Sequence, residues 1–322
     1  MEGVKIIKRP RLKKPYLVVA WPGMGEVAFK AASYLVEKLG ASEFASVKPE
    51  DFFYLAGSIV KDGLLSASEL PESKFYFWKN KGGLNDLIIF LSNAQPDLAR
   101  AESYSKIVIQ VAKSFKVEQV VSFASMPQAM DHTQAPGVWF AATSQELSSN
   151  LKKLNLNSLA EGQISGMNGL FLGMAKREGL DGVCLLGEIP LYTIQIENPK
   201  ASAAVLKALS KFTGIRVDAS GLINQGHTMD EEINKLLEFL KLAPAAAQPI
   251  GEEDIEKIKK SLNQLTRLPV SVKDRIEQLF SQAQADMSKA RELKIELDKW
   301  SVYKEYEDRF LDLFKKTGEK NN

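Results

Sequence analysis

The sequence predicts an α/β protein, a three-layer α/β/α sandwich followed by an all-α C-terminal extension. Short β-branched runs alternate with helical patterns over about the first 240 residues, as in a sheet covered by helices. Residues 87–91 and 183–186 are apolar at every position, which is typical of strands buried on both faces. Charge indicates the extension, because charged side chains make up 30 of the 72 residues from 251 to 322 but only 52 of the first 250.

The expected strands are short runs rich in β-branched and aromatic residues. They cover residues 16–21, 74–78, 86–91, 119–124, 138–142, 182–186 and 192–196. Region 57–78 has the pattern of a hairpin or meander insert. The pattern leaves open whether the sheet is wholly parallel.

The expected helices lie between the strands. They cover residues 26–39, 99–115, 145–154, 166–177, 199–213 and 229–240. In the first of them apolar residues recur at helical spacing, at positions 28, 31, 35 and 39. Gly40 follows in the position of a helix-ending glycine.

The domain organisation follows from the change in charge density. Residues 1–242 are expected to form the α/β domain, 243–251 a linker, and 252–322 the charged helical extension. The linker carries two prolines and no charge. Apolar residues in the extension form narrow stripes, at 255–265, 272–280 and 287–314. Such helices cannot bury their apolar faces alone, so they pack on each other, on the core or on another chain.

Composition excludes several classes of protein. The net charge of +2 gives no strong attraction to nucleic acid or anionic membrane. No apolar run approaches the roughly 18 residues of a membrane span, so we expect a cytoplasmic protein. The single cysteine, Cys184, excludes a disulfide framework and lies in an apolar run, as a buried thiol does. The basic stretch at residues 5–14 is interpreted as a solvated tail, with contact to a polyanion as the alternative.

A glycine motif follows the first of these strands. Residues 23–28 match the loose form G-x-G-x-x-A of a dinucleotide fingerprint. However, Glu26 would place a negative charge where a phosphate should lie, and no second strand ends in a suitable acid. We therefore favour a tight strand-to-helix turn that needs glycine.

If the strands run parallel, their carboxyl ends meet at one edge of the sheet, which is the usual ligand crevice. The residues expected at this candidate crevice are Gly23, Met24, Gly25, Glu26, Asn93, Asp97, Met126, His132, Gly166 and Glu188. Carboxylates with one histidine are suited to general acid–base chemistry. Alternatively, Asp97 and Glu26 cap helices and Glu188 shapes a turn. The catalytic residues stay unassigned, and no metal site or cofactor is expected.

Several motifs follow one another in a specific order. They are Val18-Val19-Ala20-Trp21-Pro22-Gly23-Met24-Gly25, Asn93-Ala94-Gln95-Pro96-Asp97, Asp131-His132-Thr133-Gln134-Ala135-Pro136, Ile164-Ser165-Gly166-Met167-Asn168-Gly169, Gly187-Glu188-Ile189-Pro190-Leu191-Tyr192 and Asn198-Pro199. In order and spacing this series resembles the proteasome assembly chaperone 2 (PAC2) family. The resemblance covers most of residues 10–240 and leaves the extension outside.

The resemblance implies a fold similar to the nucleoside phosphorylase and peptidyl-tRNA hydrolase group, and usually a homo-oligomer. It also implies a role in assembling proteasome subunits, as for archaeal and eukaryotic members. It carries over no catalytic residue. The last residues, 319–322, do not match the hydrophobic–tyrosine–any-residue ending that docks some partners on proteasome rings.

Three functions are therefore weighed. The leading hypothesis is a non-catalytic assembly or interaction protein that acts as a homo-oligomer with a protein partner. The alternative is an enzyme or binding protein for a nucleoside or a carboxylate-bearing ligand, using the crevice. A nucleic-acid binder using the basic N-terminal stretch is the third, and the near-neutral charge argues against it.

Overall fold

The structure is a computed structural model that describes residues 3–242, apart from 56 and 62, and residues 270–318, apart from 300 and 301. The chain divides into two compact units. The first comprises Met1–Phe53 and Leu70–Asn263, and the second comprises Tyr54–Glu69 and Gln264–Asn322. The predicted linker, 243–251, and the first apolar stripe of the extension lie outside the described residues.

A nine-stranded sheet forms the centre of the first unit. Its strands, in spatial order, are β1 (Val4–Ile6), β3 (Ser42–Val47), β6 (Ser73–Trp78), β7 (Leu87–Ser92), β2 (Tyr16–Ala20), β8 (Gln119–Gln128), β11 (Gly182–Pro190), β9 (Val138–Ala142) and β10 (Asn157–Ser158). The four central strands, β7, β2, β8 and β11, are parallel. Strands β6 and β9, which flank them, run antiparallel. The carboxyl ends of the four central strands therefore meet at one edge.

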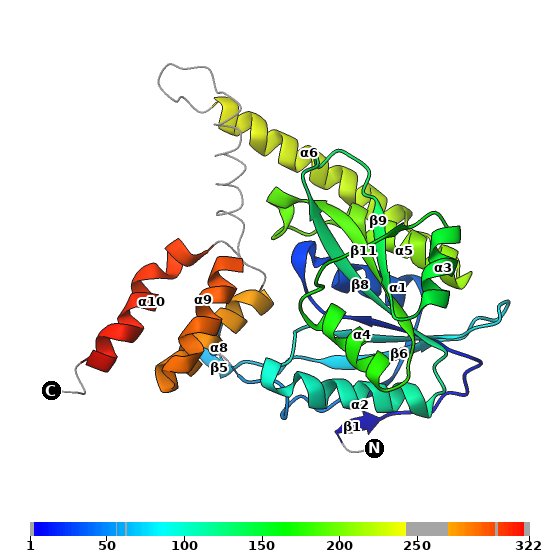
Figure 1. The fold of residues 1–322 in the computed structure, drawn as a ribbon, viewed down its shortest axis with the longest axis horizontal. Helices are drawn as coiled ribbons and strands as arrows, with labels where there is room; N and C mark the ends of the chain where they lie inside the picture. The colour runs from blue at the N-terminus through cyan, green and yellow to red at the C-terminus, as the bar shows by residue number, and fades with distance from the viewer. Residues whose placement is uncertain (1–2, 56, 62, 243–269, 300–301, 319–322) are drawn as a thin grey trace. The chain divides into compact units, whose positions relative to one another are not determined.

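Helices cover both faces of this sheet (Figure 1). One face carries α1 (Val27–Leu39), α3 (Gln145–Lys153), α5 (Pro199–Thr213) and α6 (Ser220–Leu242). The other carries α2 (Ala101–Ser114) and α4 (Met167–Arg177). Because side chains alternate along a strand, Val18 packs with the first set while Leu17 and Val19 pack with the second. The predicted three-layer sandwich is confirmed.

The predicted strand at 192–196 is wrong. Strand β11 continues to Pro190 and is followed by a 3-10 turn, η3 (Leu191–Thr193). The Thr193 hydroxyl donates to the Pro190 carbonyl oxygen at 3.0 Å, which closes this turn. The side chain of Tyr192 then bonds a loop outside the sheet. Local β-propensity is overridden here by these side-chain hydrogen bonds.

Four further elements of the first unit differ from the expectation. Strands β1, β3 and β10 were not predicted, because their segments lack a clear alternation. Helix α6 begins at Ser220, nine residues before the predicted start. The first turns of α6 contain Gly221 and Gly226, and glycine has a low helix propensity. A Cβ atom on Gly221 would lie 2.9 Å from the Tyr34 hydroxyl, and one on Gly226 would lie within contact of the Lys200 side chain. These glycines thus let α1 and α5 approach α6 closely.

The basic N-terminal stretch is not the solvated tail expected from the sequence. Strand β1 pairs antiparallel with β3, and Ile7 N–H donates to the carbonyl oxygen of Phe44 at 2.8 Å. Further along, Lys13 N–H donates to the Asp86 carboxylate at 2.7 Å. The stretch is therefore held to the sheet on both sides of residue 10.

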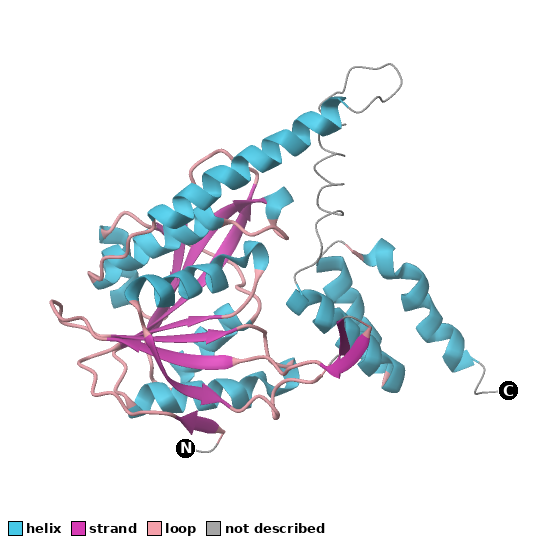
Figure 2. Cartoon of the chain, turned by 180° about the vertical axis from the view of Figure 1, so that it is seen from behind, coloured by secondary structure: helices cyan, strands magenta, loops and turns pink. Residues whose placement is uncertain are grey.

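The second unit joins a short hairpin from the middle of the sequence to the C-terminal helices (Figure 2). Its elements are β4 (Ser58–Lys61), β5 (Leu64–Ala67), α8 (Val270–Ala285), α9 (Ala290–Lys299) and α10 (Tyr303–Gly318). The three helices pack on one another and bury Ile276, Phe280 and Leu293. Arg309 on α10 forms a two-pronged ion pair with Glu277 on α8, with both N–O distances at 2.6 Å. Among the described helices, none is both long and apolar enough to cross a membrane.

Candidate functional site

The loop after β2, residues 21–26, lies at the carboxyl edge of the sheet, where the crevice was predicted. Gly25 and Glu26 both have left-handed backbones, with φ of +61° and +49°. A Cβ atom on Gly25 would lie 3.1 Å from Cδ1 of Ile189, so position 25 favours glycine for both conformation and space. Gly23 is extended, with φ −170°. The structure thus has the tight strand-to-helix turn that the sequence predicts.

Two side chains from distant segments hold the first half of this loop. Asn168, on α4, accepts from the Trp21 N–H and donates to the Trp21 carbonyl oxygen, each at 3.0 Å. Gln95 donates to the Pro22 carbonyl oxygen at 2.8 Å and accepts from the Met167 N–H at 3.1 Å. Both amide side chains therefore replace the backbone partners that β2 loses where it leaves the sheet.

The second half of the loop is held from the other side. The Ser125 hydroxyl, on β8, donates to the Met24 carbonyl oxygen at 2.9 Å. Gly25 N–H donates to the Ile194 carbonyl oxygen at 2.7 Å, and Asn198 N–H donates to the Gly25 carbonyl oxygen at 2.8 Å. Four segments that are far apart in the sequence, at residues 95, 125, 168 and 194–198, therefore bond one short loop.

A small cavity lies beside this loop. Its volume is about 80 Å³. It is lined by Gly23, Met24, Ala28, Gln95, Ala124, Ser125, Gln163, Ile164, Ser165, Asn168 and Leu186. Ligand pockets for drug-sized molecules usually measure roughly 300 Å³ or more, so this cavity has room for a few water molecules or a small ion.

Glu26 is the electrostatically unusual residue of the loop. Burial, together with the nearby negative charge of Glu197, raises the pKa of the Glu26 carboxyl group to about 7. Glu197 itself pairs with Lys30 at 2.8 Å, so that cation is directed to Glu197. Glu26 is the residue that precedes α1, but its side chain makes no capping hydrogen bond.

Glu188 joins two strands. One carboxylate oxygen accepts from the Gly137 N–H at 2.8 Å, and the other accepts from the Trp139 indole N–H at 2.7 Å. A Cβ atom on Gly137 would lie 2.7 Å from the carboxylate, so a glycine there allows the contact. Met126 lies beside Glu188 in the β8–β11 register. Both oxygens of this predicted acid–base candidate are thus engaged in holding β9 to β11.

Asn93 and Asp97 have local roles. The Asn93 side-chain oxygen accepts from the Glu72 N–H at 2.8 Å, which fixes the segment before β6. Asp97 accepts from the Ala99 N–H at 2.7 Å and so caps the short 3-10 helix η2 (Leu98–Arg100). The alternative interpretation of Asp97 as a helix cap agrees with this geometry.

His132 lies in a separate cluster beside α6 and is buried. The Tyr192 hydroxyl accepts from the His132 backbone N–H at 2.8 Å and lies 2.8 Å from Nδ1. Nε2 lies 3.1 Å from the Asn234 side-chain oxygen. A tautomer with a proton on Nε2 fits these contacts, because Tyr192 then donates to Nδ1 and Nε2 donates to Asn234.

An ion pair with little exposure to solvent supports the same loop. Lys200, in the first turn of α5, pairs with Asp230 on α6 at 2.7 Å, and each side chain is 14% exposed. The Lys200 ammonium group also donates to the carbonyl oxygens of His132 and Gln134. Lys200, Asp230 and Asn168 were not predicted as site residues. Little in the sequence indicates their roles, because a polar residue in an amphipathic helix is normally expected to face solvent.

Three observations concern the groups suited to covalent or metal chemistry. Burial raises the pKa of the Cys184 thiol to about 12, so it is un-ionised at neutral pH. The Ser125 hydroxyl donates to a backbone carbonyl rather than to a base. Within the part of the chain that the structure describes, no group of three or more His, Cys, Asp or Glu side chains could hold a metal ion.

Comparison with known proteins identifies the family. A model of the PAC2 family matches residues 17–237 of this chain. The chain belongs to the PAC2 family. The family predicted from the motifs is therefore confirmed.

This chain aligns with nearly the full length of several relatives. An uncharacterised protein of Methanocaldococcus jannaschii is 30% identical over 268 residues, which cover 79% of this chain and 98% of that protein. The crystal structure of Pyrococcus furiosus PbaB, an archaeal proteasome activator, matches with 25% identity and a TM-score of 0.63, covering 72% of this chain and 97% of PbaB. The structure of Pyrococcus furiosus PbaA, an archaeal homolog of proteasome-assembly chaperone, has the same fold, with 23% identity, a TM-score of 0.58 and coverage of 83% and 100%.

In this PAC2 protein the predicted crevice residues divide into four groups. Gly23 and Met24 line the small cavity, Gly25 and Gly166 each follow a lining residue in the sequence, and Glu26 lies two residues from Met24 and from Ala28. Asn93 and Asp97 organise the segments around β6 and η2. Met126 and Glu188 lie on neighbouring strands, whereas His132 belongs to the cluster of Tyr192 and Lys200. The motifs thus share one edge of the sheet without forming one open pocket.

Proposed function

We propose that this protein is a non-catalytic interaction protein that helps other proteins assemble, and that it acts as a homo-oligomer. Its membership of the PAC2 family supports this proposal. So does its similarity to PbaB, an archaeal proteasome activator, at 25% identity. Proteasome subunits are accordingly the first partners to test.

The observation that carries the proposal is the use of the motif side chains as backbone partners. A catalytic site needs a nucleophile, base or oxyanion donor that is free to meet a substrate. In this protein Asn168, Gln95 and Ser125 are engaged with the carbonyl oxygens or N–H groups of residues 21–24 and 167. These motifs therefore account for a fixed loop rather than for a reaction.

The hairpin of β4 and β5 supports contact with a protein. Leu64 and Leu65 are 76% and 73% exposed, and Val60 is 64% exposed. Because directly opposite residues share a face, Val60 and Leu65 project from one side of the hairpin and Leu64 from the other. A two-stranded hairpin is marginally stable alone, and exposed apolar residues on both sides favour burial against another chain.

The nucleoside or carboxylate alternative has less support. The cavity beside the loop measures about 80 Å³, which is small for a nucleoside. Its polar lining side chains Gln95, Ser125 and Asn168 already have hydrogen-bond partners. A ligand of this size would have to displace them.

The test is partner capture in the native cell with the full chain. The tagged protein is cross-linked, purified and analysed by mass spectrometry, and its mass in solution is measured by light scattering against the 35.7 kDa chain. We expect co-purification of proteasome subunits or of another multi-subunit particle, and a multiple of the chain mass. The test variant is the full chain carrying Leu64→Ser and Leu65→Ser. We expect it to capture less partner than the native chain does at equal expression.

Two results would contradict the proposal. One is recovery of a monomer with no protein above the level of a tag-only control. The other is a rise in melting temperature with a nucleoside or a carboxylate metabolite, accompanied by its turnover. Either would favour the ligand-binding alternative.

A further inference from the structure

A fixed basic segment crosses the edge of the sheet opposite the loop site. We call residues 8–14 the basic strap. Lys8 N–H donates to the Phe44 carbonyl oxygen at 3.2 Å. Lys13 N–H donates to the Asp86 carboxylate at 2.7 Å, and Asp86 N–H donates back to the Lys13 carbonyl oxygen at 2.9 Å. The strap precedes β2 directly, so it lies at the amino ends of the parallel strands.

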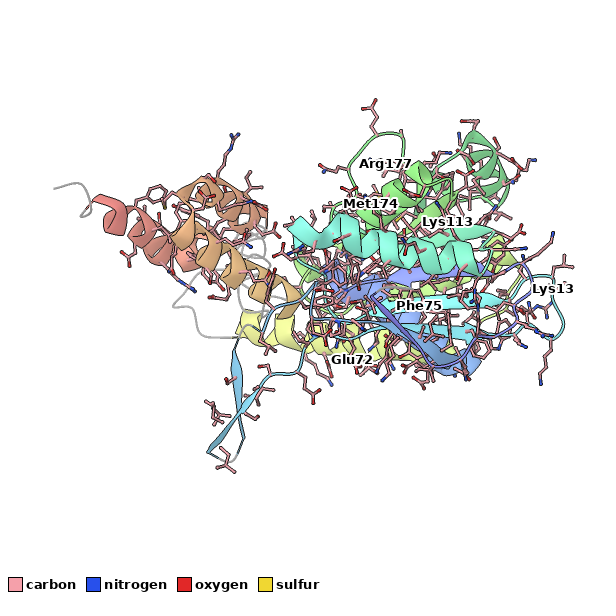
Figure 3. All side chains as sticks on the ribbon, turned by 90° about the horizontal axis from the view of Figure 1, so that it is seen from below. Lys13, Glu72, Phe75, Lys113, Met174 and Arg177 are labelled. Carbon is pink, nitrogen blue, oxygen red and sulfur yellow. The ribbon has the colours of Figure 1, made fainter. Side chains whose placement is uncertain are left out.

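The strap concentrates positive charge. Its five cations are all exposed, namely Lys8, Arg9, Arg11, Lys13 and Lys14. Figure 3 shows Lys13 at the margin of the α/β unit. Neighbouring loops at the same edge add three exposed lysines, Lys79, Lys81 and Lys116. Among the described residues, none of these eight cations forms an ion pair with a carboxylate within 4.0 Å.

The acidic groups near the strap do not cancel this charge. The Asp86 carboxylate is buried and accepts from two backbone N–H groups, those of Lys13 and Asn80. Glu118 is exposed and lies beside Tyr16, where its charge helps to raise the pKa of the phenol. Residues 8–14, 79–86 and 115–118 thus carry eight cations and two acids, whereas the whole chain carries a net charge of only +2. One further acid, the half-buried Glu43, precedes the Phe44 whose carbonyl oxygen accepts from Lys8 N–H.

Exposed aliphatic side chains lie near these cations in the sequence. Ile6 and Ile7, directly before the strap, are 44% and 58% exposed. Leu84, two residues before Asp86, is 74% exposed. Cations of the strap lie over two aromatic rings, since Lys8 is 4.9 Å from the centre of the Phe77 ring and Arg9 is 5.8 Å from that of Phe115. Phe77, Trp78 and Phe115 are each half-buried, so the exposed apolar side chains described at this edge are aliphatic rather than aromatic.

This combination separates two classes of polyanion. Single-stranded nucleic acid binds through phosphates and through bases stacked on aromatic side chains, and it would leave the aliphatic residues uncovered. An acidic protein segment can pair carboxylates with the cations and bury its own apolar residues against Ile6, Ile7 and Leu84. Because the strap is held at both ends, binding would cost little ordering of its backbone.

We propose that the basic strap, together with Ile6, Ile7 and Leu84, docks an acidic segment of a partner protein in which carboxylates alternate with aliphatic residues. An extended strap of this length reaches roughly 20 Å, so the docked segment is of similar length. The inference rests on the proposed function as an interaction protein, and it specifies the chemistry of one partner surface.

The test uses the full chain and defined probes. A short fluorescein-labelled peptide in which Asp and Glu alternate with Leu and Val is titrated by fluorescence anisotropy. The second probe has serine in place of the aliphatic residues, and the third is oligothymidylate of equal charge. The variant is Arg11→Gln, Lys13→Gln and Lys14→Gln, which keeps the packed Lys8 and Arg9. The matched control is Lys152→Gln, Lys153→Gln and Lys207→Gln, three exposed lysines elsewhere in the unit.

We expect the aliphatic–acidic peptide to bind most tightly, and the strap variant to bind it about tenfold more weakly than the control does. Equal or tighter binding of oligothymidylate would overturn the proposal, as would equal loss in the control or no binding by the native chain. Equal binding of the serine peptide would also overturn it, because the aliphatic residues would then contribute nothing. Thermal unfolding followed by circular dichroism checks the fold of each variant, which should have the melting temperature of the native chain. Partner capture from the native cell tests the proposed function, and the peptide titration tests the strap. Each experiment can therefore fail without the other.

Discussion

Replacing Glu26 with glutamine is the sharpest test of the electrostatics at the loop. In the native chain burial and the charge of Glu197 raise the pKa of the Glu26 carboxyl group from 4.5 to about 7. At pH 8.5 the folded protein therefore holds a carboxylate in an unfavourable place. Glutamine has nearly the same shape and no charge, so it removes this cost.

The size of the effect follows from the shift in pKa. One pKa unit corresponds to about 1.4 kcal/mol, so the full shift corresponds to roughly 3 kcal/mol. Glu26 keeps some contact with solvent, which screens part of this, and we expect about 1–2 kcal/mol. For a domain of this size that is a rise in melting temperature of roughly 2–8 °C at pH 8.5.

The sign depends on pH. Between 4.5 and about 7 the folded protein binds more protons at Glu26 than the unfolded chain does. Its contribution to stability is therefore present in full below pH 4.5 and is lost as the pH rises through 7. Glu26→Gln should accordingly have the stability of the native chain near pH 4.5 and exceed it increasingly from pH 5 to 8.5.

The assay is urea unfolding followed by tryptophan fluorescence at a series of pH values between 4.5 and 8.5. Glu37→Gln is the control, since Glu37 is an exposed glutamate near the other end of α1. A stability difference for Glu26→Gln that is the same at every pH would refute the reasoning. So would a loss of stability at pH 8.5.

Three further substitutions test the contacts of the loop and its neighbours by urea unfolding. Asn168→Ala leaves the buried backbone groups of Trp21 without partners and should cost roughly 2–5 kcal/mol; a cost under 1 kcal/mol would mean that water replaces the amide. Glu188→Gln turns one accepting oxygen into an N–H that faces a donor, so it should destabilise by about 1–3 kcal/mol, and a gain in stability would contradict the geometry. Gly25→Ala should cost about 1–2 kcal/mol more than Gly40→Ala, which has the same φ of +61° in open space; equal costs would show that the close contact contributes nothing.

The fold was largely predictable because two of its central strands contain continuously apolar runs. The run at 87–91 and the run at 183–186 are apolar on both faces, and only a sheet between two helical layers buries both. The edge strands were not predictable in the same way. β3 contains Ser42, Glu43 and Ser46, and it is a strand because β6 supplies a partner rather than because of its own pattern.

The edge of the sheet at which the motif residues gather was predictable, whereas the contacts of their side chains were not. Parallel strands place the residues after β2, β7, β8 and β11 at one edge, as expected from the alternation of strands and helices. The use of each side chain depends on contacts between residues far apart in the sequence. Asn168 and Trp21 are 147 positions apart, and no local pattern indicates that an amide on a helix will complete the backbone of a strand.

The sequence by itself determined the layered architecture, the family and the edge at which the motifs gather, because periodicity, apolar runs and glycine turns act over a few residues. The tertiary structure decided that Glu188 joins two strands, that His132 is enclosed by Tyr192 and Asn234, and that the basic stretch is a fixed strap. Those outcomes depend on which donor meets which acceptor after the chain has folded. A carboxylate or an imidazole looks the same in a sequence whether its partner is a substrate or its own backbone.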